Sequence, residues 1–276
     1  MPELPEIETI KNELRRVIVG KTIADFWCDS KKQINYPVEK YKKIIKGKKI
    51  LEIQRRAKNL IIQLSAKYNL LAHLKLTGQL IYLKNQKELK KWKYTHIIFY
   101  FTDKSFLIFN DVRKFGYIKI YSDQDLAKEI EKIHLGTEPL AKEFTYQKFK
   151  ELLAKRPNNK IKLFLMDQSL ISGIGNIYAN EILFAAKILP TRLVKILKED
   201  EIKKIFVEIK NILIDAIKHK GSSVDDYLDA KGKKGGYDKL LKVYGKKGKP
   251  CPRCGRIIKR ISLGQRGTFF CPKCQK

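Results

Sequence analysis

Four of the chain's five cysteines lie in two C-x-x-C pairs near its C-terminal end, and they constrain the fold of that end more than any other feature. The pairs are Cys251 with Cys254 and Cys271 with Cys274, and sixteen residues separate them. Each pair offers two thiolates, so the two pairs together complete the tetrahedral coordination of one Zn²⁺. We expect a structural zinc, because four thiolates leave no open position for water or substrate.

The segment between the cysteine pairs is rich in positive charge. Its basic residues are Arg256, Lys259, Arg260 and Arg266. We expect the metal to fix residues 257–270 as a hairpin with a basic tip, which suits an anionic partner. The alternative is a zinc ribbon that only stabilises the end of the chain.

The first nine residues read MPELPEIET. A small second residue favours removal of Met1, which would leave Pro2 with a free secondary amine next to the carboxylate of Glu3. Such an amine has a pKa of about 7.7–8.0 and is nucleophilic near neutral pH. Its attack on an aldehyde or a sugar C1′ gives an iminium, which acts as an electron sink. The alternative is that the two Pro-Glu pairs only begin a helix, because Pro suits the first helical position and Glu the first turn.

Apolar periodicity divides the chain into a β-rich part and a helical part. Ile7, Ile10, Leu14 and Ile18 recur at helical spacing and predict a helix over residues 5–19. Short β-prone runs separated by turn-like segments follow, and they predict an antiparallel sandwich or barrel. These runs are residues 50–53, 60–64, 70–76, 79–83, 94–101, 106–109 and 116–121.

After about residue 130 the pattern becomes helical. Helices are predicted from Thr145, over 161–168, after Gly175 and, as the longest, over 199–220. Residues 221–248 are rich in Gly, Lys and Asp and predict a loop. We therefore expect an α+β chain with a β domain at 1–130, a helical domain at 131–248 and a metal module at 249–276.

The chain carries 59 Lys and Arg against 29 Asp and Glu, a formal net charge of +30. A cationic field of this size favours nucleic acid as the partner. Because 48 of the 59 are Lys, the excess can also reflect an AT-rich genome, so charge alone does not decide. No apolar run reaches the roughly 20 residues of a membrane span, and the start lacks the apolar core of a signal peptide. We expect neither a membrane partner nor secretion.

Two loops have residue types that suit nucleic acid. Residues 111–116 read DVRKFG and set Arg113 two residues from Phe115, a pair that can fill the gap left by an extruded base. The alternative is a loop salt bridge and a core Phe. Residues 172–178 read SGIGNIY, and small residues before a helix favour an anion such as phosphate, although an ordinary tight turn is the alternative. By default His73 is a hydrogen-bonded strand residue and Lys58 a solvated surface charge.

Taken in order, several motifs resemble those of the bacterial formamidopyrimidine-DNA glycosylases, which excise oxidised purines such as 8-oxoguanine. They run along the whole chain. The motifs are PELPE at 2–6, QRRAK at 54–58, HL at 73–74 with TG at 77–78, DVRKFG at 111–116, LMDQ at 165–168, GIGNIYANE at 173–181 and QRGTFFC at 265–271.

The resemblance implies roles at the reacting sugar. Pro2 matches the nucleophile that attacks C1′ of the damaged nucleotide, and Glu3 matches the acid/base that helps to open the sugar ring. Glu6 matches a second active-site carboxylate. Glu181 matches a supporting group near the terminal amine.

The same resemblance implies contacts with DNA. Arg113 and Phe115 match two of the three side chains that fill the vacated base stack. The third is Leu76, where the family usually has Met, and Lys75 stands where it usually has Gly. Four residues match positions that hold phosphates around the lesion, namely Lys58, His73, Asn176 and Arg266. Of these, Lys58 and Arg266 are also expected among the catalytic residues.

The family fold that is implied has three parts. They are an N-terminal antiparallel β-sandwich with an N-terminal helix, a helix-two-turn-helix DNA-binding domain with a lesion-capping loop, and a C-terminal zinc-finger β-hairpin. The loop falls at residues 222–237 and carries Asp225 and Asp226 where a Lys is sometimes found.

The implied activity belongs to base excision repair. The chain would remove oxidised purines through a Schiff base on its N-terminal proline and cut the strand by β,δ-elimination. The expected partner is damaged double-stranded DNA and the expected cofactor is one structural Zn²⁺. We expect a monomer in the bacterial cytoplasm, associated with the nucleoid through DNA.

Three alternatives compete with this interpretation. Endonuclease VIII uses the same terminal Pro on oxidised pyrimidines, but it usually begins PEGPE, so Leu4 and the long loop after the last helix favour the purine branch. A non-catalytic DNA-binding protein on the same scaffold could lose Pro2 or Glu3, and both are present. An RNA-binding zinc-ribbon protein would have no role for Arg113 and Phe115.

Overall fold

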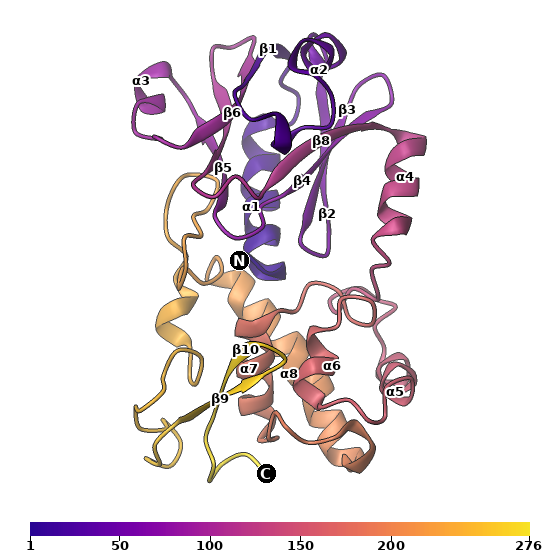
Figure 1. Cartoon of the computed structure of the whole chain (residues 1–276), viewed down its shortest axis with the longest axis vertical. Helices are drawn as coiled ribbons and strands as arrows, with labels where there is room; N and C mark the ends of the chain where they lie inside the picture. Colours follow the sequence, from indigo (N-terminus) through magenta and orange to yellow (C-terminus); the bar gives the residue numbers. More distant parts are fainter. The chain divides into compact units, whose positions relative to one another are not determined.

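A computed structural model describes all residues, 1–276, and the chain packs into two units (Figure 1). The first unit comprises residues 1–133 and 219–238, and the second comprises residues 134–218 and 239–276. The predicted α+β class is confirmed, with the N-terminal helix, the β-sheets, the helical part and the C-terminal hairpin all present. The finer division at residues 130 and 248 stays a prediction. No helix combines the length and the hydropathy that a membrane crossing requires.

The first unit contains two four-stranded antiparallel sheets. One has the strand order β1-β6-β7-β5 and the other the order β2-β3-β4-β8. The strands are β1 (Ile23–Cys28), β2 (Ile50–Arg56), β3 (Asn59–Leu64), β4 (Tyr68–His73), β5 (Gly78–Leu83), β6 (Thr95–Phe101), β7 (Phe106–Asp111) and β8 (Tyr117–Ser122). The inward-facing side chains of both sheets share one apolar cluster, so the unit is a sandwich in the sense that the sequence predicted.

Helix α1 (Leu4–Ile18) is the main helix of this core. It contacts β2 and β3 of one sheet and β5 of the other. Ile7, Ile10, Leu14 and Ile18 are at most 1% exposed, as their helical spacing predicted. Burial of this apolar face fixes the helix, and with it the start of the chain, against the sandwich. The remaining helical pieces of the unit are η1 (Lys31–Gln33), α2 (Val38–Ile45), α3 (Gln86–Leu89) and α4 (Asp123–Lys132).

Residues 219–238 are distant in sequence yet pack with the first unit. The backbone N–H of Tyr82 in β5 donates to the carbonyl of Ala230 (2.9 Å), and Tyr227 is buried in the apolar cluster. The carboxylate of Glu13 in α1 accepts from Lys220 (2.8 Å) and from the N–H of Ala230 (3.1 Å). The segment therefore belongs physically with α1 and β5.

The second unit is built around helix α7 (Asn176–Ala186), which is apolar almost all round and buried along its length. It packs against α6 (Ile161–Met166) and α8 (Glu199–Lys218) and contacts the hairpin strand β10 (Arg266–Phe270). The other elements are α5 (Tyr146–Ala154), η2 (Val194–Ile196), β9 (Lys259–Leu263) and the 3₁₀ turn η3 (Tyr237–Leu240), which spans the boundary between the units.

Candidate active site and nucleic-acid interface

The N-terminal end of α1 is buried together with two carboxylates. Glu3 is the residue before the helix and Glu6 its third residue, and the two form a reciprocal capping box. The carboxylate of Glu6 accepts from the N–H of Glu3 at 2.7 Å. Glu3 is 3% exposed and Glu6 is 1% exposed. The PELPE start thus forms a rigid helix beginning that holds Pro2 at a defined place.

Glu6 also joins this helix start to the segment 219–238. Its other carboxylate oxygen accepts from the N–H of Ser222 at 2.8 Å. Gly221, the residue before Ser222, has φ +74°, and a Cβ there would lie 2.6 Å from the same Glu6 oxygen. Glycine is needed because of both its conformation and this close approach. Glu6, which the sequence predicts as a second active-site carboxylate, therefore connects two segments that are distant in sequence.

Met1 covers the nitrogen of Pro2. In the full chain this nitrogen is part of a peptide bond, and the terminal amine of Met1 lies 2.9 Å from the carboxylate of Asp225, an exposed residue of the segment 219–238. The secondary amine that the sequence predicts as a nucleophile exists only after Met1 has been removed.

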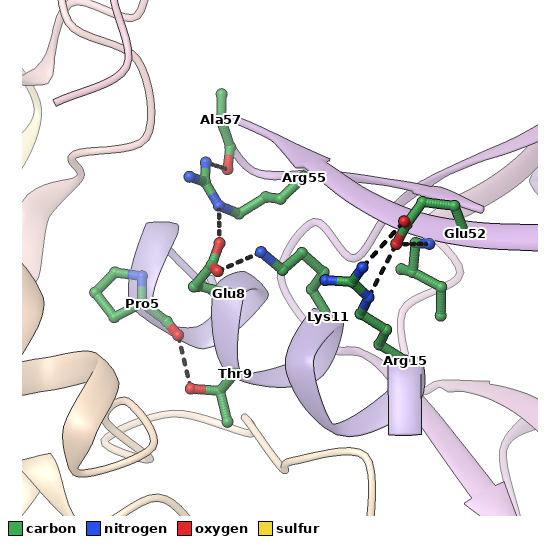
Figure 2. A network of polar contacts seen from close by, with 9 residues as sticks. Pro5, Glu8, Thr9, Lys11, Arg15, Glu52, Arg55 and Ala57 are labelled. Atoms are coloured by element: carbon green, nitrogen blue, oxygen red, sulfur yellow. Dashed lines mark hydrogen bonds and ion pairs between the residues drawn. The ribbon is translucent and has the colours of Figure 1, made fainter. Parts of the chain in front are cut away.

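A polar network ties α1 to the β2–β3 hairpin (Figure 2). Burial opposes ionisation of Glu8, but hydrogen bonds from Lys11 and Arg55 hold the pKa of Glu8 below its usual value. Arg55 reaches Glu8 at 2.7 Å and the carbonyl of Ala57 at 3.0 Å, while Arg15 binds Glu52 at 3.0 Å. The paired charges therefore fix the hairpin turn that contains Lys58.

Lys58 lies in that turn and is only 7% exposed, in contrast to the solvated surface charge that is the default for a lysine. Asn59, the next residue, pairs with His73 across β3 and β4. Lys58 and His73 therefore lie at the same end of one sheet, as a common binding role requires.

His73 is held as a neutral imidazole. Its Nδ1 accepts from the backbone N–H of Lys75 at 2.9 Å, so the proton of the neutral ring lies on Nε2. Burial and the charges of Lys75 and Lys58 lower its pKa to about 3. Near neutral pH, His73 can offer an N–H donor to an anion without carrying a charge of its own.

Two tight loops at one end of the sandwich present exposed side chains. Residues 74–77 connect β4 to β5, and residues 112–116 connect β7 to β8, so each loop crosses from one sheet to the other. Leu76 is 38% exposed and Phe115 53% exposed. The guanidinium of Arg113 lies over the ring of Phe115, 4.7 Å from its centroid, and forms no ion pair with a carboxylate. The alternatives of a loop salt bridge and a core Phe are not what the structure contains.

One carboxylate organises both loops. Asp111 is completely buried and accepts from the hydroxyl of Thr77 and the N–H of Gly116 (2.8 Å), with a longer contact to the N–H of Arg113 (3.3 Å). The amide of Gln33 donates to it as a further partner at 3.1 Å. Sequence reasoning singled out Arg113 and Phe115 in this motif and missed Asp111, although it begins the same DVRKFG run.

In the second unit, Asn176 and Arg266 lie on elements that contact each other. Asn176 is the first residue of α7, and its amide donates to the carbonyl of Gly267 in β10 at 3.1 Å. Asn180, one turn later, accepts from the N–H of Phe269 at 2.7 Å. Arg266 is exposed at the start of β10, next to the hairpin turn. The α7 start and the basic hairpin tip are thus held together.

Glu181 on α7 has its carboxylate occupied by backbone. It accepts from the N–H groups of Lys242 (2.9 Å), Val243 (3.0 Å) and Tyr244 (2.8 Å). Burial raises its pKa, and these hydrogen bonds oppose the rise. Glu181 fixes the segment 242–244 to α7, and its role near the terminal amine stays a prediction.

The four paired cysteines form one cluster. All four sulfurs lie within 4.8 Å of one another, with Cys251 and Cys274 at 3.9 Å and Cys254 and Cys271 at 3.5 Å. Zinc–sulfur bonds of about 2.3 Å set the edge of a ZnS₄ tetrahedron near 3.8 Å, so the cluster fits the metal. The prediction of one structural zinc is confirmed. Arg253 ties this knuckle to the end of α7 through the carbonyls of Phe184 (2.6 Å) and Ala185 (3.1 Å).

Family models match three consecutive parts of the chain. They are the formamidopyrimidine-DNA glycosylase N-terminal domain at residues 1–118, its H2TH domain at residues 135–227, and the zinc finger found in FPG and IleRS at residues 248–276. The chain belongs to the formamidopyrimidine-DNA glycosylase family.

Individual relatives match this chain along almost their full lengths, in sequence and in structure. A formamidopyrimidine-DNA glycosylase of Carboxydothermus hydrogenoformans is 43% identical, covering 100% of both chains, and one of Bacillus cereus is 39% identical, covering 100% of this chain and 99% of its own. Among solved structures, the Lactococcus lactis Fpg with an abasic site containing DNA has a TM-score of 0.91 at 37% identity, covering 99% of both chains. The same relative with an N7-Benzyl-Fapy-dG containing DNA has a TM-score of 0.90 at 37% identity, covering 100% of both.

Replacing the zinc ligand Cys271 with Ser should release the metal, because three thiolates hold zinc less tightly than four. We expect one zinc per chain in the wild type, a loss of most of it in Cys271→Ser, and a lower melting temperature. Metal analysis and thermal unfolding measure both. Cys28→Ser is the matched control and should keep the metal; a zinc content that falls equally in both variants would contradict the assignment.

Asp111→Asn should loosen both exposed loops at once. An amide has one acceptor oxygen, so its NH₂ group would face at least one donor that the carboxylate now binds, at a cost of about 1–3 kcal/mol in unfolding free energy. Binding of duplex DNA should weaken with it. The control is Asp103→Asn, which alters a carboxylate of the β6–β7 turn that accepts from Ser105. Equal effects on DNA binding in the two variants would argue against a specific role.

The depressed pKa of His73 predicts a pH dependence of stability. Between pH 6.5 and about 3 the unfolded chain binds a proton at this residue and the native chain does not, so its contribution to stability is lost as the pH falls through that window. In His73→Asn the free energy of unfolding should fall less steeply between pH 7 and 4, by up to about 1.4 kcal/mol per pH unit. His134→Asn, at an exposed position, should leave the wild-type slope unchanged.

Proposed function

We propose that this chain is a base-excision-repair DNA glycosylase and AP lyase that removes oxidised purines, 8-oxoguanine and formamidopyrimidines, with the amine of Pro2 as its nucleophile. The observation that carries the proposal is the buried, doubly capped start of α1, which would hold a free Pro2 amine beside the carboxylate of Glu3. The names of the full-length relatives support the same activity. A chain with this task would work in the cytoplasm on nucleoid DNA.

The chemistry follows from the secondary amine. Its nitrogen attacks C1′ of the damaged nucleotide, the bond to the base breaks, and the sugar ring opens to an iminium at C1′. Glu3 would supply and take back the proton at the sugar ring oxygen. The iminium acidifies the C2′–H bond, so water takes the C2′ proton and the electrons of that bond expel the 3′ phosphate from C3′. Loss of a second proton, from C4′, then expels the 5′ phosphate from C5′. Water then hydrolyses the iminium, which releases the remaining sugar fragment as an aldehyde and regenerates the amine.

The other predicted residues would hold the DNA in a form that exposes the lesion. Lys58 and His73 lie together in the first unit, and Asn176 and Arg266 lie on contacting elements of the second. Cationic and N–H donors of this kind bind phosphates. Leu76, Arg113 and Phe115 would enter the space that the flipped nucleotide leaves, since all three project from the two loops fixed by Asp111.

A second substrate class has an observation of its own. One structure of the Lactococcus lactis relative holds an oxidized pyrimidine containing DNA. Oxidised pyrimidines would therefore be a further substrate of this chain. Parallel assays with 8-oxoguanine and 5-hydroxyuracil duplexes rank the two classes, and a faster reaction with the pyrimidine would favour the endonuclease VIII alternative.

Borohydride trapping on a duplex with 8-oxoguanine opposite cytosine tests the nucleophile. Wild-type protein should form a covalent adduct, and Pro2→Gly should reduce its rate by roughly two orders of magnitude or more, the scale on which loss of a nucleophile slows covalent catalysis. Pro5→Ala, in the same helix start, should retain trapping. Intact mass must show that Met1 is absent from the reactive molecules. Absence of any adduct with 8-oxoguanine, 5-hydroxyuracil and abasic duplexes would overturn the catalytic proposal.

A further inference from the structure

A second group of cations surrounds the tyrosine next to His73. His73 and Tyr117 are paired across β4 and β8, with ring centroids 5.8 Å apart. The ammonium of Lys75 lies 5.7 Å from the centroid of the Tyr117 ring and that of Lys119 lies 4.8 Å from it. Residues 117 and 119 point to the same face of β8 because side chains alternate along a strand. The cluster thus combines two ammonium groups, one aromatic ring and one neutral imidazole.

No carboxylate forms an ion pair with Lys75 or Lys119, whereas a minority of the other lysines, among them Lys11, Lys21 and Lys42, have such partners. Burial raises the pKa of the Tyr117 hydroxyl, and the charge of Glu129 raises it further. Burial and the charges of Lys75 and Lys58 together lower the pKa of His73. Lys75 and Lys119 therefore place two ammonium groups around one aromatic ring, and neither forms an ion pair with a carboxylate of the chain.

The backbone conformation of Lys75 is also unfavourable. Its φ is +52°, in the left-handed region that glycine adopts without strain and other residues rarely adopt. The bond from its N–H to His73 and the turn closed by Gly78 N–H to the carbonyl of Leu74 (2.9 Å) hold it there. A glycine would form the same turn with less strain. Neither local conformation nor charge pairing accounts for a lysine at this position.

We infer that Lys75 and Lys119 join the Nε2–H of His73 in binding one phosphate of the DNA strand, so that two ammonium groups are added to the contacts set out above. A phosphodiester supplies the negative charge that the cluster lacks, and its oxygens can accept from the ammonium groups and the imidazole at once. Lys75 directly precedes Leu76, so this phosphate lies close to the base step that Leu76 would enter. The inference rests on the proposed function, because DNA is the source of the phosphate.

The salt dependence of DNA binding tests the inference without any chemistry. Affinity for a duplex with a stable abasic analogue is measured between 0.05 and 0.2 M salt for wild type and Lys75→Gly. Loss of one phosphate contact should reduce the slope of log affinity against log salt by about 0.9, so the advantage of the wild type shrinks roughly 3- to 4-fold over that range. Thermal stability should stay equal or rise, because glycine relieves the positive φ.

Further variants separate charge from backbone. Lys75→Gln removes the charge and keeps the strained backbone, so it should show the same loss of slope without a gain in stability. Lys75→Arg should keep the wild-type slope, and Lys119→Gln should lose part of it. The matched control is Lys67→Gly, at the other end of β4, where an exposed lysine also has a positive φ of +60°. It should gain stability and leave the slope unchanged.

The outcomes distinguish this inference from the proposed function. A wild-type slope in Lys75→Gly and Lys75→Gln overturns the phosphate site, even if the wild type still forms the borohydride-trapped adduct. An equal loss of slope in Lys67→Gly overturns it too, because any surface lysine would then have the same effect. Failure of wild type to form the adduct overturns the proposed chemistry and leaves the binding comparison valid.

Discussion

The buried carboxylate of Glu6 accepts two backbone N–H groups, one from Glu3 and one from Ser222, and the position of the chain's first residues depends on it. A helix start normally leaves such N–H groups to water. Here the first group and one from a segment more than two hundred residues away share a single side chain. The proposed nucleophile is a backbone nitrogen, so only the fixed backbone can set its position.

Buried carboxylates repeat this arrangement elsewhere. Asp111 gathers donors from two loops and Gln33, and Glu181 gathers three consecutive N–H groups after η3. In each case one charge satisfies several backbone or amide donors, which offsets the cost of burying it. Only six of the 29 Asp and Glu are buried, so the excess of positive charge on the surface follows from composition and burial of these carboxylates adds a little to it.

The sequence predicted those features whose physical basis is local. Cysteine spacing gave the zinc cluster, apolar periodicity gave α1, and seven β-prone runs matched β2 to β8 within a few residues. Strand β1 was missed, since it lacks clean alternation and has an irregular register between Ile23 and Asp25. Burial of Lys58, exposure of Phe115 and the hub at Asp111 depend on partners far apart in sequence. No local pattern encodes those partners, so only the structure reveals them.

The docking of residues 219–238 on α1 has a consequence for the order of events during synthesis. The N-terminal end leaves the ribosome first, while chains grow at about 5–20 residues per second. Until residue 222 has been made, Glu6 lacks one of its donors, and until residue 225 has been made, the amine of Met1 lacks its carboxylate partner. Removal of Met1, which the proposed nucleophile requires, would therefore take place on a nascent chain before its amine can pair with Asp225. On this order of events the proposed nucleophile would be formed before its surroundings are complete.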